Sequence, residues 1–156
     1  MSGGEDRYRR GMYTFFKRTA PHPNLMTLDC PDSNVTCVKR ERSNTPLAAL
    51  ITLNNAVFHE AAQALARQGL SVDFKSDEDR INFIFRSCVA RPTAEHEQET
   101  LVRLLVTNRE WYQQHTAEAG RLIGDNTIAD VPVSELAAWV ATSRIVLNMD
   151  EFITRE

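Results

Sequence analysis

The sequence predicts an all-α protein, an irregular bundle of about five to six helices with a long ordered N-terminal loop. Three observations predict this fold class. Apolar residues recur at i, i+3, i+4 and i+7 through most of residues 46–149, and strand-like alternation is scarce. The chain of 156 residues, 42% of them hydrophobic, is long enough to bury one core. We therefore expect residues 1–156 to form a single helical domain.

The first predicted element covers residues 7–19. Its apolar side chains recur at helical spacing: Tyr8, Met12, Phe15 and Phe16. The run Tyr13-Thr14-Phe15 would also suit a strand, so both structures stay open, with helix preferred. Pro21-His22-Pro23 ends the element, because proline removes a donor and biases its predecessor to extended geometry.

Residues 21–45 form a long polar loop, with one short turn expected near Asn24–Leu28. Connections of this length inside a compact domain are usually functional or disordered. The loop ends at Thr45-Pro46, which predicts a helix with Thr45 as N-cap and Pro46 in its first turn. An apolar stripe then continues to Gln68, and Gly69 is the expected stop. Asn54-Asn55 is a point at which this helix could divide in two.

Two further helices follow. Ser76 is the expected cap of the first, whose apolar face consists of Ile81, Ile84, Phe85 and Cys88. The chain turns at Arg91-Pro92, and Thr93 is the expected cap of the second. The apolar side chains of that helix are Leu101, Leu104, Leu105, Trp111 and Tyr112.

Residues 115–131 carry a weaker helical pattern, with Gly120 and Gly124 as breakers. The last element, residues 133–149, is apolar nearly all round and contains Trp139. A helix of this kind is central, with the other helices packed around it.

Charge and hydropathy limit the classes of partner. The net charge of −3 argues against general nucleic-acid binding. Residues 1–45 hold 8 Lys and Arg against 5 Asp and Glu, so an anionic partner would prefer the N-terminal third. No apolar run approaches the roughly 18 residues of a membrane helix, and the first residues lack the layout of a signal peptide. We expect no membrane insertion.

The familiar catalytic and metal motifs do not occur, so we expect no metal site and no cofactor. The three cysteines offer neither the haem motif Cys-x-x-Cys-His nor the paired ligands of a zinc site. His59-Glu60 with Gln63 comes close to the zinc-protease motif, but Gln63 replaces the second imidazole, which favours an ordinary helix surface pair. Cys30 and Cys37 lie near enough in the loop for a bridge that the sequence alone does not establish.

The loop before Pro46 is the candidate binding site. Its cations and amide could form a fork for a carboxylate, a phosphate or an acidic sugar beside the helix start. The candidate ligand-binding residues are His22, Asp29, Lys39, Arg40, Arg42 and Asn44. The simpler interpretation is that the cations pair internally with Asp29, Asp32 and Glu41 and fasten the loop to the bundle.

Several ordered segments resemble the planctomycete-specific domain family known as domain of unknown function 1553. The segments are RRGMYTFFKRT (9–19), LDCPD (28–32), RERSNTPLAAL (40–50), LNN (53–55) and FRSCVARP (85–92). The tail, from ELAAW at 135–139 to LNMDEFITRE at 147–156, is similar as well. Cys37 matches the family's usual cysteine, whereas Cys30 stands where alanine is common, which raises the chance of a bridge between them.

The resemblance implies a setting and no established activity. It implies that the chain is the C-terminal portion of a larger domain in a multidomain protein of the periplasm or cell envelope. Its partners would then be the upstream domains of that protein, of which a c-type cytochrome domain is common. We expect a non-catalytic interaction or structural module. The alternative is part of a hydrolase-like, anionic-ligand or glycan site that upstream residues complete.

Overall fold

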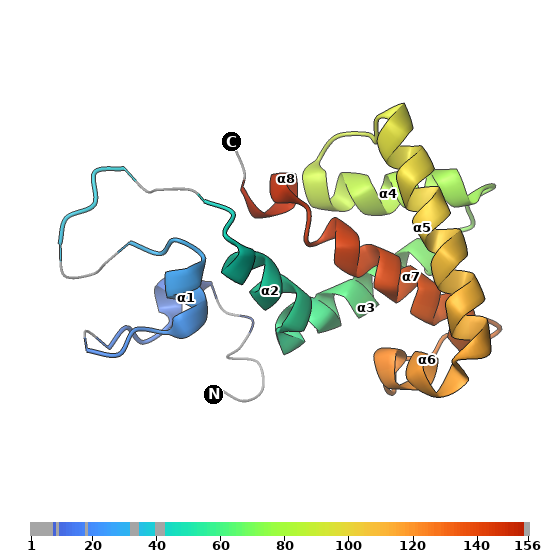
Figure 1. The fold of residues 1–156 in the computed structure, drawn as a ribbon, viewed down its shortest axis with the longest axis horizontal. Coiled ribbons are helices and arrows are strands. Elements are labelled where there is room, and N and C mark those ends of the chain that lie inside the picture. The colour runs from blue at the N-terminus through green and yellow to red at the C-terminus, as the bar shows by residue number, and fades with distance from the viewer. Residues whose placement is uncertain (1–7, 9, 18, 32–34, 40–42, 155–156) are drawn as a thin grey trace.

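The structure, a computed structural model, describes residues 8, 10–17, 19–31, 35–39 and 43–154. Over these residues the chain forms one 3-10 turn and eight α-helices (Figure 1). The elements are η2 (Gly11–Tyr13), α1 (Pro23–Thr27), α2 (Pro46–Asn54), α3 (Ala56–Ser71), α4 (Asp77–Val89), α5 (Glu95–Gln114), α6 (Thr116–Ile123), α7 (Val133–Val146) and α8 (Asp150–Ile153). The described residues therefore confirm the predicted all-α class.

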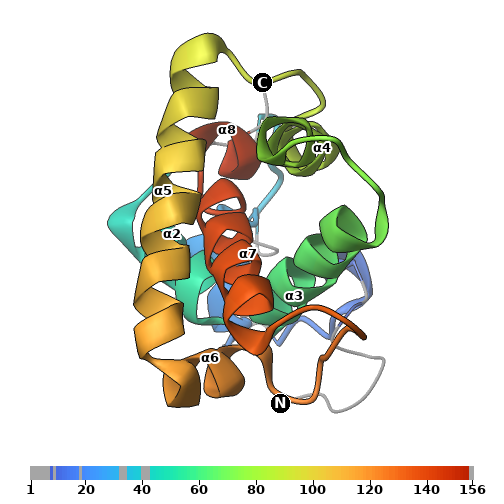
Figure 2. The same ribbon diagram turned by 90° about the vertical axis from the view of Figure 1, so that its right-hand side faces the viewer.

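Helix α7 lies at the centre of the bundle, as predicted. It runs between α3 and α5, with α6 across one end (Figure 2). Eight of its residues are buried, and Trp139 is fully inaccessible to solvent. Around it lie the largest buried side chains of the other helices: Phe85, Ile81, Ile84, Leu105 and Ile123.

The helix that begins at Pro46 divides at Asn55. Thr45 caps α2, and the side-chain oxygen of Asn55 accepts a hydrogen bond from the Val57 amide and caps α3. The expected stop at Gly69 is wrong, because α3 continues to Ser71. Gly69 is buried where a Cβ atom would lie 3.1 Å from Cδ1 of Ile84, so its small size lets α3 and α4 approach closely.

Ser76 caps α4 as predicted, since its hydroxyl accepts a hydrogen bond from the Asp79 amide at 3.1 Å. The predicted Thr93 cap of α5 is wrong. The Glu97 carboxylate instead accepts a hydrogen bond from the Ala94 amide, and Ala94 takes the cap position. The Thr93 amide donates to the Asn82 side chain, which ties the turn back to α4.

Gly124 ends α6 with a φ of +56°, as expected for a breaker. Gly120 was expected to break the segment as well, but it lies inside α6. The short helix α8 was not predicted, because four residues are too few to show a helical period.

The predicted helix over residues 7–19 is wrong in the described part of this segment. Only the 3-10 turn Gly11–Tyr13 forms, and Thr14 is already extended. Short helices depend on packing an amphipathic face, and Met12, Tyr13 and Phe15 are all exposed here. The expected turn near Asn24–Leu28 is confirmed as α1.

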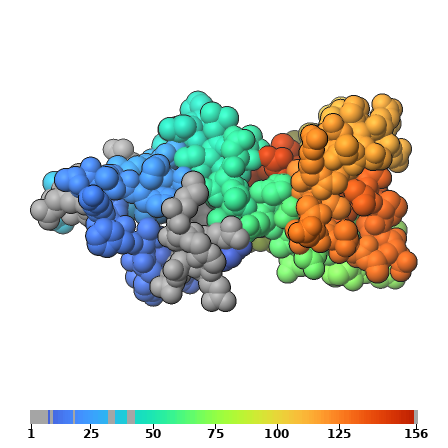
Figure 3. All heavy atoms as spheres, turned by 90° about the horizontal axis from the view of Figure 1, so that it is seen from below, coloured from blue at the N-terminus to red at the C-terminus, as the bar shows by residue number. Residues whose placement is uncertain are grey.

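The N-terminal residues extend to one side of the bundle (Figure 3). The 3-10 turn packs on α1, and a Cβ atom at Gly11 would lie 2.8 Å from Cδ2 of Leu25. The Tyr8 hydroxyl donates a hydrogen bond to the Glu60 carboxylate on α3. Among the described helices, none has the length and hydropathy needed to cross a membrane.

Candidate functional site

We call the described residues before α2 (8, 10–17, 19–31, 35–39 and 43–45) the N-terminal segment. The candidate site lies where this segment joins the bundle, at a place that we call the Ser43 corner (Asp29, Ser43, Asn44 and Asp150). The Ser43 amide donates to Oδ2 of Asp29 at 2.7 Å, and the Ser43 hydroxyl lies 3.0 Å from both oxygens of that carboxylate. The Asn44 side-chain amide donates to Oδ1 of Asp150 on α8 at 2.8 Å. Segments from both ends of the described chain therefore meet at the start of α2.

The bundle fixes the position of this corner through α2. The Thr52 hydroxyl donates to the side-chain oxygen of Asn148, just beyond α7. Nη2 of Arg144 on α7 donates to the Leu53 carbonyl at the end of α2, at 2.6 Å. Both polar contacts lie within the last three residues of α2, so they fix the end of this helix to the bundle, and the corner precedes its other end.

The structure brings two of the candidate residues, Asp29 and Asn44, to the corner. Lys39 is exposed on the preceding segment, and its carbonyl accepts a hydrogen bond from the Cys37 thiol at 3.3 Å. His22 is exposed and precedes α1, at the opposite end of that helix from Asp29. Arg40 and Arg42 lie outside the described residues, as do the expected internal partners Asp32 and Glu41.

The chemistry of the corner is carboxylate binding. Ser43 supplies a backbone and a hydroxyl donor, Asn44 supplies an amide donor, and in the structure these groups bind carboxylates of the chain itself. Asp29 has a φ of +55°, a left-handed conformation that is uncommon for residues other than glycine, although aspartate adopts it more often than most. Asp150 could not have been found by reading the N-terminal third, because it lies 106 residues from Asn44.

All three cysteines are free thiols, so the bridge between Cys30 and Cys37 is not formed. Cys88 is a core residue as predicted, and burial raises the pKa of its thiol to about 11. At this pKa the group is a protonated thiol at neutral pH and a poor nucleophile.

The charged residues of the bundle form two ion-pair clusters. In the first, the Arg109 guanidinium on α5 binds both Asp77 of α4 and Glu135 of α7, with shortest N–O distances of 2.5 and 2.6 Å. The Glu135 carboxylate also accepts a hydrogen bond from Nε1 of Trp139 at 2.8 Å. The guanidinium lies 5.8 Å from the Trp139 ring centroid. Hydrogen bonding to Arg109 lowers the pKa of Asp77, against the opposing effect of burial.

In the second cluster, Arg91 connects the turn before α5 to α8. Its guanidinium binds Glu97 at 2.8 Å and Glu151 at 2.5 Å, and lies 4.9 Å from the Phe85 ring centroid. The hydrogen bond to Arg91 is the main cause that lowers the pKa of Glu97 to about 2. Both clusters join helices that are distant in sequence, so their role is to hold the bundle together.

The comparison with protein families matches residues 1–105 to the model described as "Protein of unknown function (DUF1553)". The chain belongs to this family. The match contains the segments from residue 9 to residue 92 that carried the resemblance, whereas the similar tail lies beyond it. Searches of curated proteins and of solved structures found no match.

In this member of the family, His59 and Gln63 have a structural position. Gln63 is buried and donates to the carbonyls of Leu122 and Ile123 at 2.8 and 3.2 Å, where α6 ends. Its side chain also lies 3.0 Å from the His59 ring. No group of three or more His, Cys, Asp or Glu side chains among the described residues could hold a metal ion.

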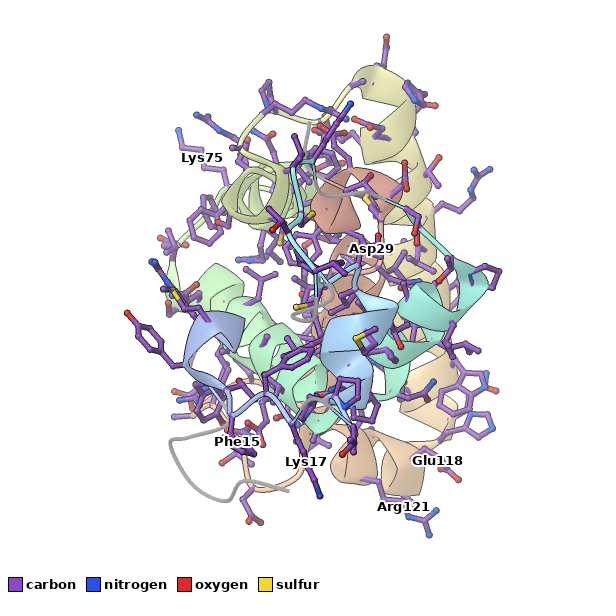
Figure 4. All side chains as sticks on the ribbon, turned by 90° about the vertical axis from the view of Figure 1, so that its left-hand side faces the viewer. Phe15, Lys17, Asp29, Lys75, Glu118 and Arg121 are labelled. Atoms are coloured by element: carbon purple, nitrogen blue, oxygen red, sulfur yellow. The ribbon has the colours of Figure 1, made fainter. Side chains whose placement is uncertain are left out.

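The N-terminal segment exposes large apolar side chains. Met12 is 76% exposed, Phe15 85% and Val38 98%. Phe15 and Lys17 lie near each other at one edge of this segment (Figure 4). Large apolar side chains at such exposure are candidates for contact with a partner.

Proposed function

We propose that this chain is a non-catalytic interaction and assembly module, and that its N-terminal segment binds another domain of a multidomain cell-envelope protein. One observation carries the proposal. The bundle has a complete core of its own, while Met12, Phe15 and Val38 of the N-terminal segment are the most exposed large apolar residues described. Covering apolar side chains at this exposure with a partner removes them from water, which lowers the free energy of the complex.

The charges around the segment support the same proposal. Arg10, Lys17 and Lys39 are exposed, and each lies within two residues of Met12, Phe15 or Val38 in the sequence. A partner that is apolar at its centre and acidic at its rim would match them, because interface rims are polar and charge complementarity raises the rate of association. The upstream domains that the family resemblance implies, among them a c-type cytochrome domain, are the partners that we propose.

The ion-pair clusters of the bundle also support a non-catalytic role. Arg91 and Arg109 are each held by two carboxylates of the chain, and Cys88 is a buried protonated thiol. Catalytic groups instead lie in clefts with a donor or acceptor directed at substrate. Here the guanidinium groups of Arg91 and Arg109 are directed at carboxylates of the chain itself.

The test is a binding titration between this chain and the separately expressed other domains of its parent protein, by isothermal titration calorimetry. We expect measurable binding that weakens at least tenfold in Phe15→Ser, since a hydrophobic interface residue is removed. Val72→Ser is the matched control, because Val72 is also an exposed apolar residue, at 42%, but lies at the end of α3. Absence of binding, or equal loss in both variants, would contradict the proposal.

A second candidate function is recognition of an anionic ligand or acidic glycan near the Ser43 corner, within a site completed by other parts of the parent protein. The observation in its favour is that Ser43 and Asn44 already bind carboxylates, so the donors have the required chemistry. The proposed ligand-binding residues are His22, Asp29, Lys39, Arg40, Arg42 and Asn44. In this case the double variant Arg40→Ala/Arg42→Ala would lose affinity for a uronate oligosaccharide while keeping its melting temperature.

A further inference from the structure

The outer face of α4 has a composition unlike that of a simple solvated helix face. The inner face of this helix is buried in the core through Ile81, Ile84, Phe85 and Cys88. The opposite side, which we call the α4 outer face, consists of Asp79, Asn82, Phe83, Arg86 and Ser87, with Phe74 from the preceding loop. Helix α4 lies at the edge of the bundle, where this face can be reached (Figure 2).

These residues line a shallow open pocket of about 430 Å³. Its apolar part is a pair of aromatic rings, Phe74 and Phe83, with centroids 5.3 Å apart and planes tilted by 43°. The Arg80 guanidinium, 5.8 Å from the Phe74 ring centroid, supports Phe74 from the inner side. The aromatic rings are therefore held in place and partly open to solvent.

The polar groups around the rings include charges without an ion pair and a side-chain donor without an acceptor among the described residues. Within the described part of the chain, neither the Asp79 carboxylate nor the Arg86 guanidinium forms an ion pair. The Asn82 oxygen accepts a hydrogen bond from the Thr93 amide, which leaves its amide nitrogen as a donor. Asp79 and Arg86 are seven residues apart on one helix face, about 10 Å along the axis. They are too distant to pair with each other.

The order of these residues is self-complementary. Asp79 and Arg86 lie at equal distances on either side of the pair Asn82-Phe83. Two copies of α4 placed antiparallel about a two-fold axis at this midpoint would set each Asp79 against the Arg86 of the other copy. The same operation brings the Phe83 rings of the two copies together at the centre.

We propose that the α4 outer face binds the same face of a second copy of this chain, with the two α4 helices antiparallel. The apolar centre with charged groups at its ends has the usual anatomy of a protein interface. The opposite charges fix the antiparallel register, since a parallel arrangement would place like charges together. This surface is separate from the N-terminal segment, so the proposal does not depend on the function proposed above.

The size of the face sets the expected strength. Helix α4 has 13 residues and is about 20 Å long, so two such helices bury less than the roughly 800 Å² per partner of a standard interface. The dimer is therefore weak and reversible, with a dissociation constant between about 10 μM and about 1 mM. Added salt weakens it, because both ion pairs lie at the solvent-exposed rim.

Sedimentation equilibrium of the full 156-residue chain, from about 10 μM to about 1 mM protein, tests the proposal. We expect wild type to dimerise and each of the charge reversals Asp79→Arg and Arg86→Asp to weaken the dimer at least tenfold. An equimolar mixture of the two variants should dimerise again, because each then offers the charges that the other lacks. The double variant Asp79→Arg/Arg86→Asp should also recover.

Melting curves show whether each variant is folded. If a charge reversal lowers the melting temperature by more than about 10 °C, the neutral variants Asp79→Asn and Arg86→Gln replace it, with the same direction of effect. A chain that stays monomeric at about 1 mM would overturn the proposal. A dimer whose dissociation constant is unchanged by these substitutions would also overturn it, since another surface would then be responsible. A mixture of the two charge reversals that stays monomeric would overturn it as well, because Asp79 and Arg86 would then not pair across the interface.

Discussion

The two parts of the molecule are stabilised by different means. In the bundle, α3 to α7 bury a continuous core around Trp139. In the N-terminal segment, by contrast, no described residue before Ala48 is buried. Polar contacts join that segment to the bundle, such as Asn44 with Asp150 and Tyr8 with Glu60. Hydrophobic burial is the larger source of stability, so the bundle should dominate folding and leave the segment available for binding.

The largest expected effect is that of Trp139→Ala. The ring is fully buried, and its Nε1 donates to Glu135, so truncation leaves a cavity and removes one of the hydrogen bonds to that carboxylate. We expect a loss of about 4 kcal/mol in the free energy of unfolding, measured by urea denaturation. Trp111→Ala is the matched control, because Trp111 is 43% exposed and stacks on His115 at the surface. Its cost should stay below about 1 kcal/mol. Equal losses in the two variants would remove the distinction between core and surface.

Arg109→Met should have the next largest effect. It leaves Asp77 and Glu135 without their shared cation, although side-chain exposures of 24 to 31% in this cluster moderate the cost. We expect a loss of about 2 kcal/mol, again from urea denaturation. Arg103→Met on the exposed side of α5 is the control and should change the free energy by less than about 0.5 kcal/mol. A neutral Arg109→Met would mean that the ion pairs add nothing to the bundle.

The pH dependence of stability tests the Arg91 cluster. The folded pKa of Glu97, about 2, lies below its ordinary value of 4.5. Its contribution is therefore complete above about pH 4.5 and is lost as the pH falls toward 2. Glu97→Gln should lower the free energy of unfolding at neutral pH by about 1 kcal/mol. It should also reduce the fall in melting temperature between about pH 4.5 and pH 2, which is the acid limb of the plot of melting temperature against pH. Glu99→Gln, at an exposed position on the same helix, is the control and should leave the acid limb unchanged. If Glu97→Gln has the same acid limb as the wild type, the Glu97–Arg91 ion pair is not its cause.

The smallest effect on stability is expected from the N-terminal segment. Phe15→Ser changes a side chain that is 85% exposed, so the free energy of unfolding should change by less than about 0.5 kcal/mol. Thermal melting of the wild type and the variant measures this difference. A loss near that of Trp139→Ala would show that Phe15 belongs to the core, and the comparison between the two parts would fail.

Sequence patterns predicted the bundle well, because its helices bury periodic apolar faces. Ser76 with the stripe of Ile81 to Cys88 defined α4, and the apolar run around Trp139 identified the central helix. Errors came from local signals that tertiary packing overrides. Gly69 resembles a helix stop, yet it lies within α3 because Ile84 of α4 packs against it.

The candidate site could be predicted only in part. Asp29 and Asn44, which meet at the Ser43 corner, were predicted as candidates because they lie in a polar loop before a clear helix start. Asp150 was missed, since the contact with Asn44 spans 106 residues and leaves no periodic trace. The predicted helix of residues 7–19 was wrong for a related reason. Its regularly spaced apolar side chains, such as Met12 and Phe15, are exposed and pack on no core, and a short helix without such packing is not stable.

Native-state hydrogen exchange tests the central claim most directly, because it measures the opening free energy of each amide. We expect the amides of α3, α5 and α7 to exchange only by global unfolding, while those of residues 10–17 and 35–39 exchange at least about a hundred times faster. Protection of these N-terminal amides equal to that of α7 in the isolated chain would show one cooperative unit and contradict the account.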